Sequence, residues 1–113
     1  MFEKSQGDGL LFIKLNTTKL DFSVAAKLKA QINTIAPELN QPVVLDFDKV
    51  TFMDSSGLAA VIFGFKVVGI GAKLSLCNVN PRLLTLFDYS GVSKTVPIYA
   101  NRDAAAKAVT DRP

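Results

Sequence analysis

The chain has 113 residues, of which 49% are hydrophobic and 20% charged, a composition that indicates one soluble globular domain with a sizeable core and excludes an intrinsically disordered chain. It contains one cysteine and no histidine, which excludes an internal disulfide, a Ser-His-Asp triad, a Cys-His pair and an imidazole metal site. The net charge of +3 comes from 13 basic and 10 acidic residues scattered along the chain, which argues against the dense basic stripe of a nucleic-acid-binding protein.

The first half of the chain predicts a strand, a helix and a second strand. Residues 10–15 are apolar at both alternating positions, as in a strand with both faces covered. Residues 23–39 carry apolar side chains at the three-and-four spacing of a helix face, and Asp21 and Ser23 are candidate caps for its first turn. The apolar run 43–47 is typical of a central parallel strand.

The middle of the chain predicts a second helix and a further strand. The helix is expected from about Ser56 to the neighbourhood of Gly69 and Gly71. The residues expected to share its main apolar stripe are Leu58, Val61, Ile62, Phe65 and Val68. The alternation over residues 73–77 predicts the strand that follows.

The last third predicts two more helices with a short strand between them. Asn80, directly before a proline, is typical of a helix start, and Gly91 of its end. A short strand is expected around residues 96–99. Asn101 would cap a final alanine-rich helix over residues 103–109.

The alternation of strands and helices predicts an α/β fold, with a mostly parallel sheet of four to five strands packed with about four helices. We expect the whole chain, residues 1–113, to form one domain. In such sheets, functional sites lie beyond the carboxyl ends of the strands. The site is therefore expected in the loop DKVTFMDSSGL, which leaves the strand over residues 43–47 and enters the second helix.

Asp54, Ser55, Ser56 and Gly57 form the candidate motif in this loop. Unpaired backbone N–H groups and the helix dipole make a helix N-terminus a favourable place for an anion. The alternative is that Asp54 or Ser55 merely caps the helix, which would contribute about 1 kcal/mol to stability.

The surrounding sequence closely resembles the STAS family and, within it, the bacterial anti-sigma factor antagonists. The resemblance spans about residues 10–99 and is carried by the segment VVLDFDKVTFMDSSGLAAVIFGFKVV followed by GAKLSLCNVNPRLLTLFDYSGVSKTVPIY. Upstream, KLDFSVAAKL resembles the family's leucine-aspartate pair before the first long helix, so that Asp21 matches the family's aspartate. Thr18 departs from the pattern, since members usually carry glycine there, and this leaves the shape of that loop open.

The resemblance implies a non-enzymatic partner switch without a cofactor of its own. By position, Ser55 is the serine that a partner phosphorylates, the partner being both an anti-sigma factor and an ATP-dependent serine kinase. The unmodified antagonist binds this partner and so releases sigma or another regulator. The phosphorylated antagonist dissociates from the partner. A metal-dependent serine phosphatase resets the switch. Ser56 would then be the helix cap or a neighbour without a transfer role.

The expected partner-binding surface combines Asp21 with the whole motif, Asp54, Ser55, Ser56 and Gly57. We also expect Phe63 and Val67, which lie off the main stripe of the second helix, to be partly exposed at the centre of the contact. The alternative for these two side chains is that they belong to the core.

Two other functions stay open from the sequence. The first is a structural role as the STAS subunit of a lipid or anion transport complex. The second is an enzyme with Ser55 as nucleophile and Asp54 or Lys66 as base, which we consider remote. Asp46 and Asp48 could suggest a magnesium site, but the other residues of phosphoacceptor receiver domains have no counterpart.

The remaining sequence features point to a cytoplasmic monomer. Cys77 is expected to be a small buried residue on a strand, without a redox partner. The polar first residues do not form a signal peptide, and the longest apolar stretch, residues 57–65, is too short to cross a membrane.

Overall fold

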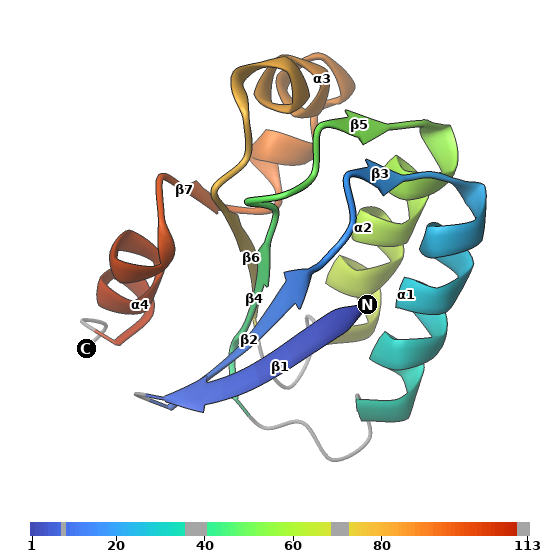
Figure 1. Ribbon diagram of the computed structural model, residues 1–113. Helices are drawn as coiled ribbons and strands as arrows, with labels where there is room; N and C mark the ends of the chain where they lie inside the picture. Colours follow the sequence, from blue (N-terminus) through green and yellow to red (C-terminus); the bar gives the residue numbers. More distant parts are fainter. Residues whose placement is uncertain (8, 36–40, 69–72, 111–113) are drawn as a thin grey trace.

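The computed structural model describes residues 1–7, 9–35, 41–68 and 73–110. Within these residues, one sheet of five strands has the spatial order β1 (Phe2–Gly7), β2 (Leu10–Leu15), β4 (Val43–Asp46), β6 (Leu74–Cys77) and β7 (Ile98–Tyr99). β1 runs antiparallel to β2, and all other neighbours are parallel (Figure 1). The prediction of a mostly parallel α/β sheet with a central strand after Pro42 is therefore confirmed.

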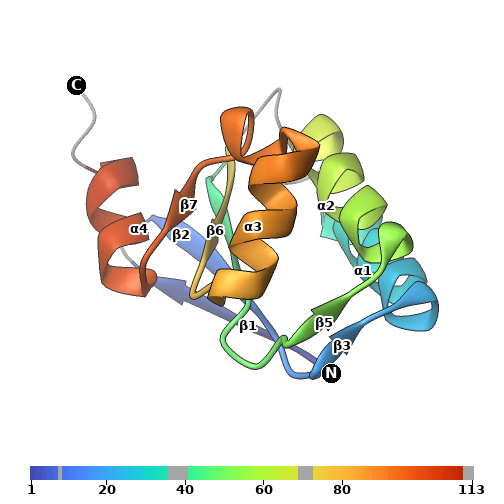
Figure 2. The ribbon, with the colours of Figure 1, turned by 90° about the horizontal axis from the view of Figure 1, so that it is seen from above.

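Four helices and one 3-10 turn surround this sheet in the described part of the chain: α1 (Phe22–Ile35), α2 (Ser55–Val68), α3 (Pro81–Ser90), η2 (Val92–Lys94) and α4 (Arg102–Thr110). α1 and α2 lie side by side on one face of the sheet, α4 lies on the other face, and α3 lies near the ends of β4 and β6 (Figures 1 and 2). The predicted continuation of the first helix over residues 36–39, and the predicted end of the second at Gly69 and Gly71, lie outside the described residues.

The first strand, β1, was missing from the prediction. Its residues after Phe2 are all exposed, so its sequence has no apolar alternation from which a strand could be inferred. Backbone pairing with β2 holds it in place, with Phe2 opposite Leu15 and Gly7 opposite Leu10. Gly9 in the connection has a φ of 76°, a conformation that favours glycine.

The buried face of α2 differs from the predicted stripe. Val61 and Val68 are buried as expected, but Ile62 is 37% exposed. The positions that replace it in the core are small: Gly57, Ala60 and Gly64. A Cβ atom at Gly57 would clash with the carbonyl oxygen of Leu20, and one at Gly64 would lie 3.0 Å from Ile32 Cδ1. Close approach of α2 to β3 at Gly57 and to α1 at Gly64 selects glycine at these two positions, which a count of large apolar side chains misses.

The predicted ends of α3 and α4 are confirmed. The backbone N–H of Leu83 donates to Asn80 Oδ1 at 3.0 Å, and Gly91 ends α3 with a φ of 85°. The N–H of Ala104 donates to Asn101 Oδ1 at 2.8 Å. These caps satisfy backbone donors that a helix start leaves unpaired.

An ion pair joins α4 to the central strand. Arg102 Nε donates to Asp46 Oδ2 at 2.7 Å, and the guanidinium lies 4.7 Å from the centroid of the Phe12 ring. Asn78 Nδ2 and the N–H of Asp48 donate to Asp46 Oδ1, each at 3.0 Å. The carboxylate of Asp46 is thus fully engaged in holding the fold, and its neighbour Cys77 is buried with a thiol pKa that burial raises to about 12.

The ionisation of Asp46 couples this contact to pH. Burial by itself raises the pKa of the carboxyl, but the hydrogen bonds from Asn78, Arg102 and Asp48, with the positive charge of Arg102, lower it below 3.8 overall. Because the pKa in the folded state lies below that in the unfolded state, the carboxylate stabilises the fold above about pH 4. This contribution is lost as the pH falls through the lowered value.

We therefore expect Asp46→Asn to lower the free energy of unfolding by about 1–3 kcal/mol near pH 7, through loss of a charge-assisted hydrogen bond. As the pH falls through the lowered pKa of Asp46, the wild type loses the same contribution, and the difference between the two proteins should shrink. Urea unfolding at several pH values measures both effects. Asp48→Asn, at an exposed side chain, is the matched control and should show neither; an Asp46→Asn difference that is independent of pH would contradict this account.

Candidate functional site

A pair of very short strands brings the starts of α1 and α2 together. β3 (Lys19–Leu20) and β5 (Phe52–Met53) run parallel, with Lys19 opposite Phe52 and Leu20 opposite Met53. Each strand leads within one residue into a helix, so the two N-termini lie next to each other (Figure 2). The sequence did not indicate either strand, because two residues are too few to show alternation.

The backbone of Thr18 fixes the entry to this pair. Its carbonyl oxygen accepts hydrogen bonds from the N–H groups of Thr51 at 2.8 Å and Phe52 at 3.1 Å, and from Thr51 Oγ1 at 3.2 Å. The threonine that departs from the family pattern therefore occupies a loop that is tied to the residues before the motif.

Asp54 caps α2. Its Oδ1 accepts the N–H of Gly57 at 3.0 Å, and its own N–H donates to the Leu20 carbonyl at 3.4 Å. The alternative in which Asp54 caps the helix is thus confirmed. Of the two possibilities for Ser56, the cap is excluded and the neighbour without a transfer role stays a prediction. Ser56 is half-buried, and Gly57 is buried at the closest approach to Leu20 and Met53.

Asp21 caps α1 in the same way. Its Oδ1 accepts the N–H of Val24 at 3.3 Å and the Ser23 hydroxyl at 3.0 Å. The hydrogen bonds from Val24 and Ser23 lower the pKa of Asp21, so the group is a carboxylate at neutral pH. Of the two predicted caps, Asp21 accepts the helix N–H, and Ser23 supports it.

Ser55 is the exposed member of the motif. It is the first residue of α2, and its hydroxyl makes no hydrogen bond to any described residue. Ser55 lies in the partial positive charge of the α2 N-terminus, and the β3–β5 pair brings the start of α1 next to that of α2, with one capping carboxylate at each helix start. The hydroxyl is thus free to react with a group delivered from outside, at a place where added negative charge is tolerated.

Two aromatic side chains of this region are exposed. Phe22, the first residue of α1, is 76% exposed, and Phe52, on β5, is 49% exposed. Phe52 and Met53 are neighbours on β5, and a strand points neighbouring side chains to opposite faces, so only Met53 turns inward.

Phe63 and Val67 lie on another side of α2. Both are half-buried against the core, and Lys29 Nζ of α1 lies 5.9 Å from the centroid of the Phe63 ring. The exposed residues of α2 that share the side of Ser55 are Ala59, Ile62 and Lys66, at spacings of four, three and four. Phe63 and Val67 therefore flank this stripe on the side of α1.

The described residues contain no cluster of three or more potential metal ligands and no helix long and apolar enough to cross a membrane.

Comparison with known proteins agrees with the geometry. The family model of the STAS domain matches residues 2–105. The chain belongs to the STAS domain family. An anti-sigma F factor antagonist from Paenibacillus polymyxa is 33% identical over 95 residues, which cover 82% of this chain and 80% of the relative.

Solved structures share the fold. An anti-sigma-factor antagonist (STAS) domain protein from Planctomyces limnophilus has a TM-score of 0.89 at 16% identity, over 97% of this STAS chain and 98% of its own. The anti-sigma factor antagonist SpoIIAA has a TM-score of 0.80 in its unphosphorylated form, at 22% identity over 100% and 99% of the two chains. Its phosphorylated form from Bacillus has a TM-score of 0.72, at 23% identity over 96% and 99%.

The cap at Asp54 yields a stability prediction for this STAS domain. We expect Asp54→Ala to lower the free energy of unfolding by about 1 kcal/mol, because the Gly57 N–H loses its acceptor. Ser55→Ala, one residue further on, is the matched control and should change stability by less than about 0.5 kcal/mol. Urea unfolding of the two variants measures this difference, and a larger loss for Ser55→Ala would contradict the assignment of the cap.

Proposed function

We propose that this STAS domain protein is an anti-sigma factor antagonist in a partner switch, with Ser55 as the phosphorylated residue. The observation that carries the proposal is the exposed Ser55 at the N-terminus of α2, directly after the capping Asp54 and beside the start of α1 that Asp21 caps. The relative named an anti-sigma F factor antagonist supports the same role. The unmodified chain binds an anti-sigma factor that is also a serine kinase, and so releases sigma or another regulator.

Phosphorylation at Ser55 is compatible with the fold. A phosphate adds about −1.5 to −2 charge and three acceptor oxygens, and helix N-termini favour such a group. Because the hydroxyl is exposed and makes no hydrogen bond to the described residues, its modification removes no internal contact of the described structure. SpoIIAA, solved in both forms, supports a switch that leaves the fold in place.

Loss of binding then follows from changes at the surface. Beside Asp21 and Asp54, the phosphate builds a strongly negative patch with a tightly held hydration shell. A shift from 1:99 to 99:1 occupancy needs about 5.5 kcal/mol of differential binding. One exposed charge pair contributes at most about 1 kcal/mol, so desolvation and steric exclusion must supply most of the difference.

Phe22 and Phe52 supply the apolar anchors of this contact. Large exposed aromatic side chains are the residues that most often dominate the energy of protein interfaces. Both belong to the segments that carry Asp21 and the motif, so a partner that covers Ser55 also covers them. Ser56 and Gly57 shape the start of α2 beneath the contact, and Phe63 and Val67 form its flank toward α1.

The partner brings the nucleotide. The sequence contains neither G-x-x-x-x-G-K-[ST] nor G-x-G-x-x-G, the two common phosphate-binding glycine motifs. A metal-dependent serine phosphatase resets the phosphorylated form.

Phosphorylation tests the proposal directly. The unmodified protein is used to isolate a serine kinase from native extract of the source cells, and the purified pair is incubated with ATP. We expect mass spectrometry to find phosphate on Ser55 and none on Ser55→Ala, whereas Ser56→Ala, the matched control, is modified like the wild type. Binding of the kinase should be lost in Ser55→Asp. Phosphate on Ser56, or isolation of transport-complex subunits without any kinase, would contradict the proposal.

The aromatic anchors give a second test with the same kinase. We expect Phe22→Ser and Phe52→Ser each to weaken binding by about tenfold or more with little change in melting temperature, since both side chains are exposed. Phe63→Ala should behave in the opposite way and lower the free energy of unfolding by about 1–3 kcal/mol, because its ring packs on α1. Calorimetric titration and thermal melts distinguish the two outcomes, and unchanged binding by both serine variants would exclude the anchors.

A further inference from the structure

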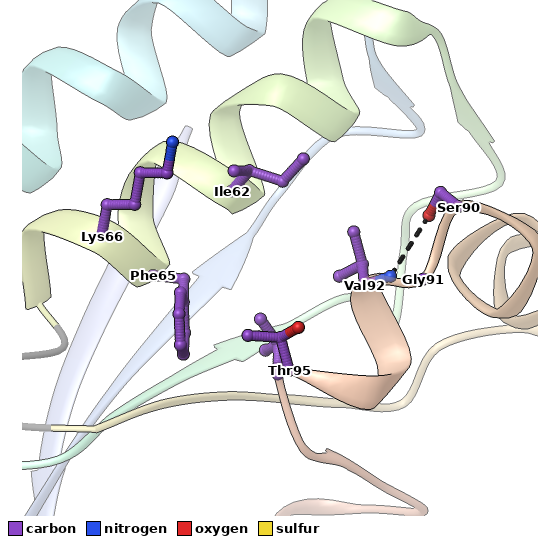
Figure 3. Close-up of a pocket in the computed structure, with 8 residues that line it drawn as sticks. Ile62, Phe65, Lys66, Ser90, Gly91, Val92 and Thr95 are labelled. Atoms are coloured by element: carbon purple, nitrogen blue, oxygen red, sulfur yellow. Dashed lines mark hydrogen bonds between the residues drawn. The ribbon is translucent and has the colours of Figure 1, made fainter.

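A cleft of about 280 Å³ lies between α2 and the segment that follows α3 (Figure 3). Its apolar walls come from Ile62 and Phe65 of α2 on one side and from Val92 and Val96 on the other. The remaining lining residues are Lys66, Ser90, Gly91 and Thr95. Lys66 carries the sole charge among the described residues that line the cleft.

The wall opposite α2 is held rigid by hydrogen bonds. Ser90 Oγ donates to the Phe87 carbonyl at 3.1 Å and accepts the Val92 N–H at 3.5 Å. The N–H groups of Thr95 and Val96 donate to the Val92 carbonyl at 2.9 and 2.8 Å. Since the Ser90 hydroxyl is satisfied internally, the polar side-chain groups left for a ligand among the described lining residues are the Lys66 ammonium and the Thr95 hydroxyl. The chemistry of the cleft therefore suits an apolar group next to a carboxylate.

The cleft lies on the same side of α2 as Ser55. The exposed residues Ser55, Ala59, Ile62 and Lys66 follow one another at spacings of four, three and four along the helix. At 1.5 Å per residue, Ile62 lies about 10 Å along α2 from Ser55. An ordinary protein–protein contact covers about 800 Å² on each partner, a patch of about 16 Å radius. A partner centred on Ser55 therefore reaches the cleft.

We propose that this cleft is a specificity pocket for the kinase that modifies Ser55, a role that rests on the proposed function. The pocket takes an apolar side chain of the kinase, and an acidic group beside that side chain pairs with Lys66. The pocket is separate from the phosphorylated serine, so it selects the partner without taking part in the phosphoryl transfer. Its rigid wall reduces the ordering cost of binding.

The test uses the purified kinase that phosphorylates Ser55 and two variants of the cleft. Ile62→Glu places a charge in its apolar wall, and Thr95→Trp fills it from an exposed rim position. We expect each to weaken kinase binding by about tenfold, as substitutions at an interface anchor do. The matched control is Lys107→Glu on the exposed face of α4, across the sheet, which should bind within about twofold of wild type although it changes the net charge by two.

A third variant keeps the test valid if a cleft substitution unfolds the chain. Lys66→Glu changes an exposed side chain, and it should weaken binding and reverse the salt dependence of the affinity, because an attractive pair becomes repulsive. If all folded cleft variants bind the kinase with wild-type affinity while Ser55→Asp does not bind it, the cleft is not a specificity pocket. The proposed partner switch is unaffected by that outcome. If no kinase modifies Ser55, the proposed function fails and the pocket fails with it.

Discussion

Two paired residues in each of two short strands hold the starts of α1 and α2 together. Lys19 pairs with Phe52 and Leu20 with Met53, and the Leu20 carbonyl also accepts the N–H of Asp54. Gly57 allows this arrangement, because any side chain there would strike the same Leu20 carbonyl. Because β3 pairs with β5, the two helix dipoles start side by side and Asp21 lies near the motif.

The polar groups around Ser55 and those on the far side of the sheet differ in burial and in hydrogen bonding. Around Ser55, the polar groups are half-exposed and the hydroxyl makes no hydrogen bond to the described residues. Across the sheet, Asp46 is buried and bound by Arg102, Asn78 and the Asp48 amide, which ties α4 to the central strand. No described hydrogen bond joins this ion pair to Asp21, Asp54 or Ser55.

The exposed apolar residues indicate where on the molecule the candidate contact surface lies. Phe22 and Phe52 lie on the segments that enter the two helices, and Ile62 lies along α2. The sequence predicted that Phe63 and Val67 are partly exposed at the centre of the contact; both are half-buried against the core, and their place in the contact stays a prediction. Helical periodicity identified α2 correctly, but it does not say which neighbour covers each side of a helix that is apolar all round.

The sequence by itself determined the order of the four described helices and of strands β2, β4, β6 and β7, the caps at Asn80 and Asn101, and the motif from Asp54 to Gly57. These features depend on local chemistry: apolar spacing, side-chain acceptors and glycine, each within a few residues. Tertiary structure alone decided β1, β3 and β5, the burial of Gly57 and Gly64, and the exposure of Phe52 and Ile62. All of these depend on contacts between segments distant in the chain, where backbone pairing and close helix packing outweigh local preference.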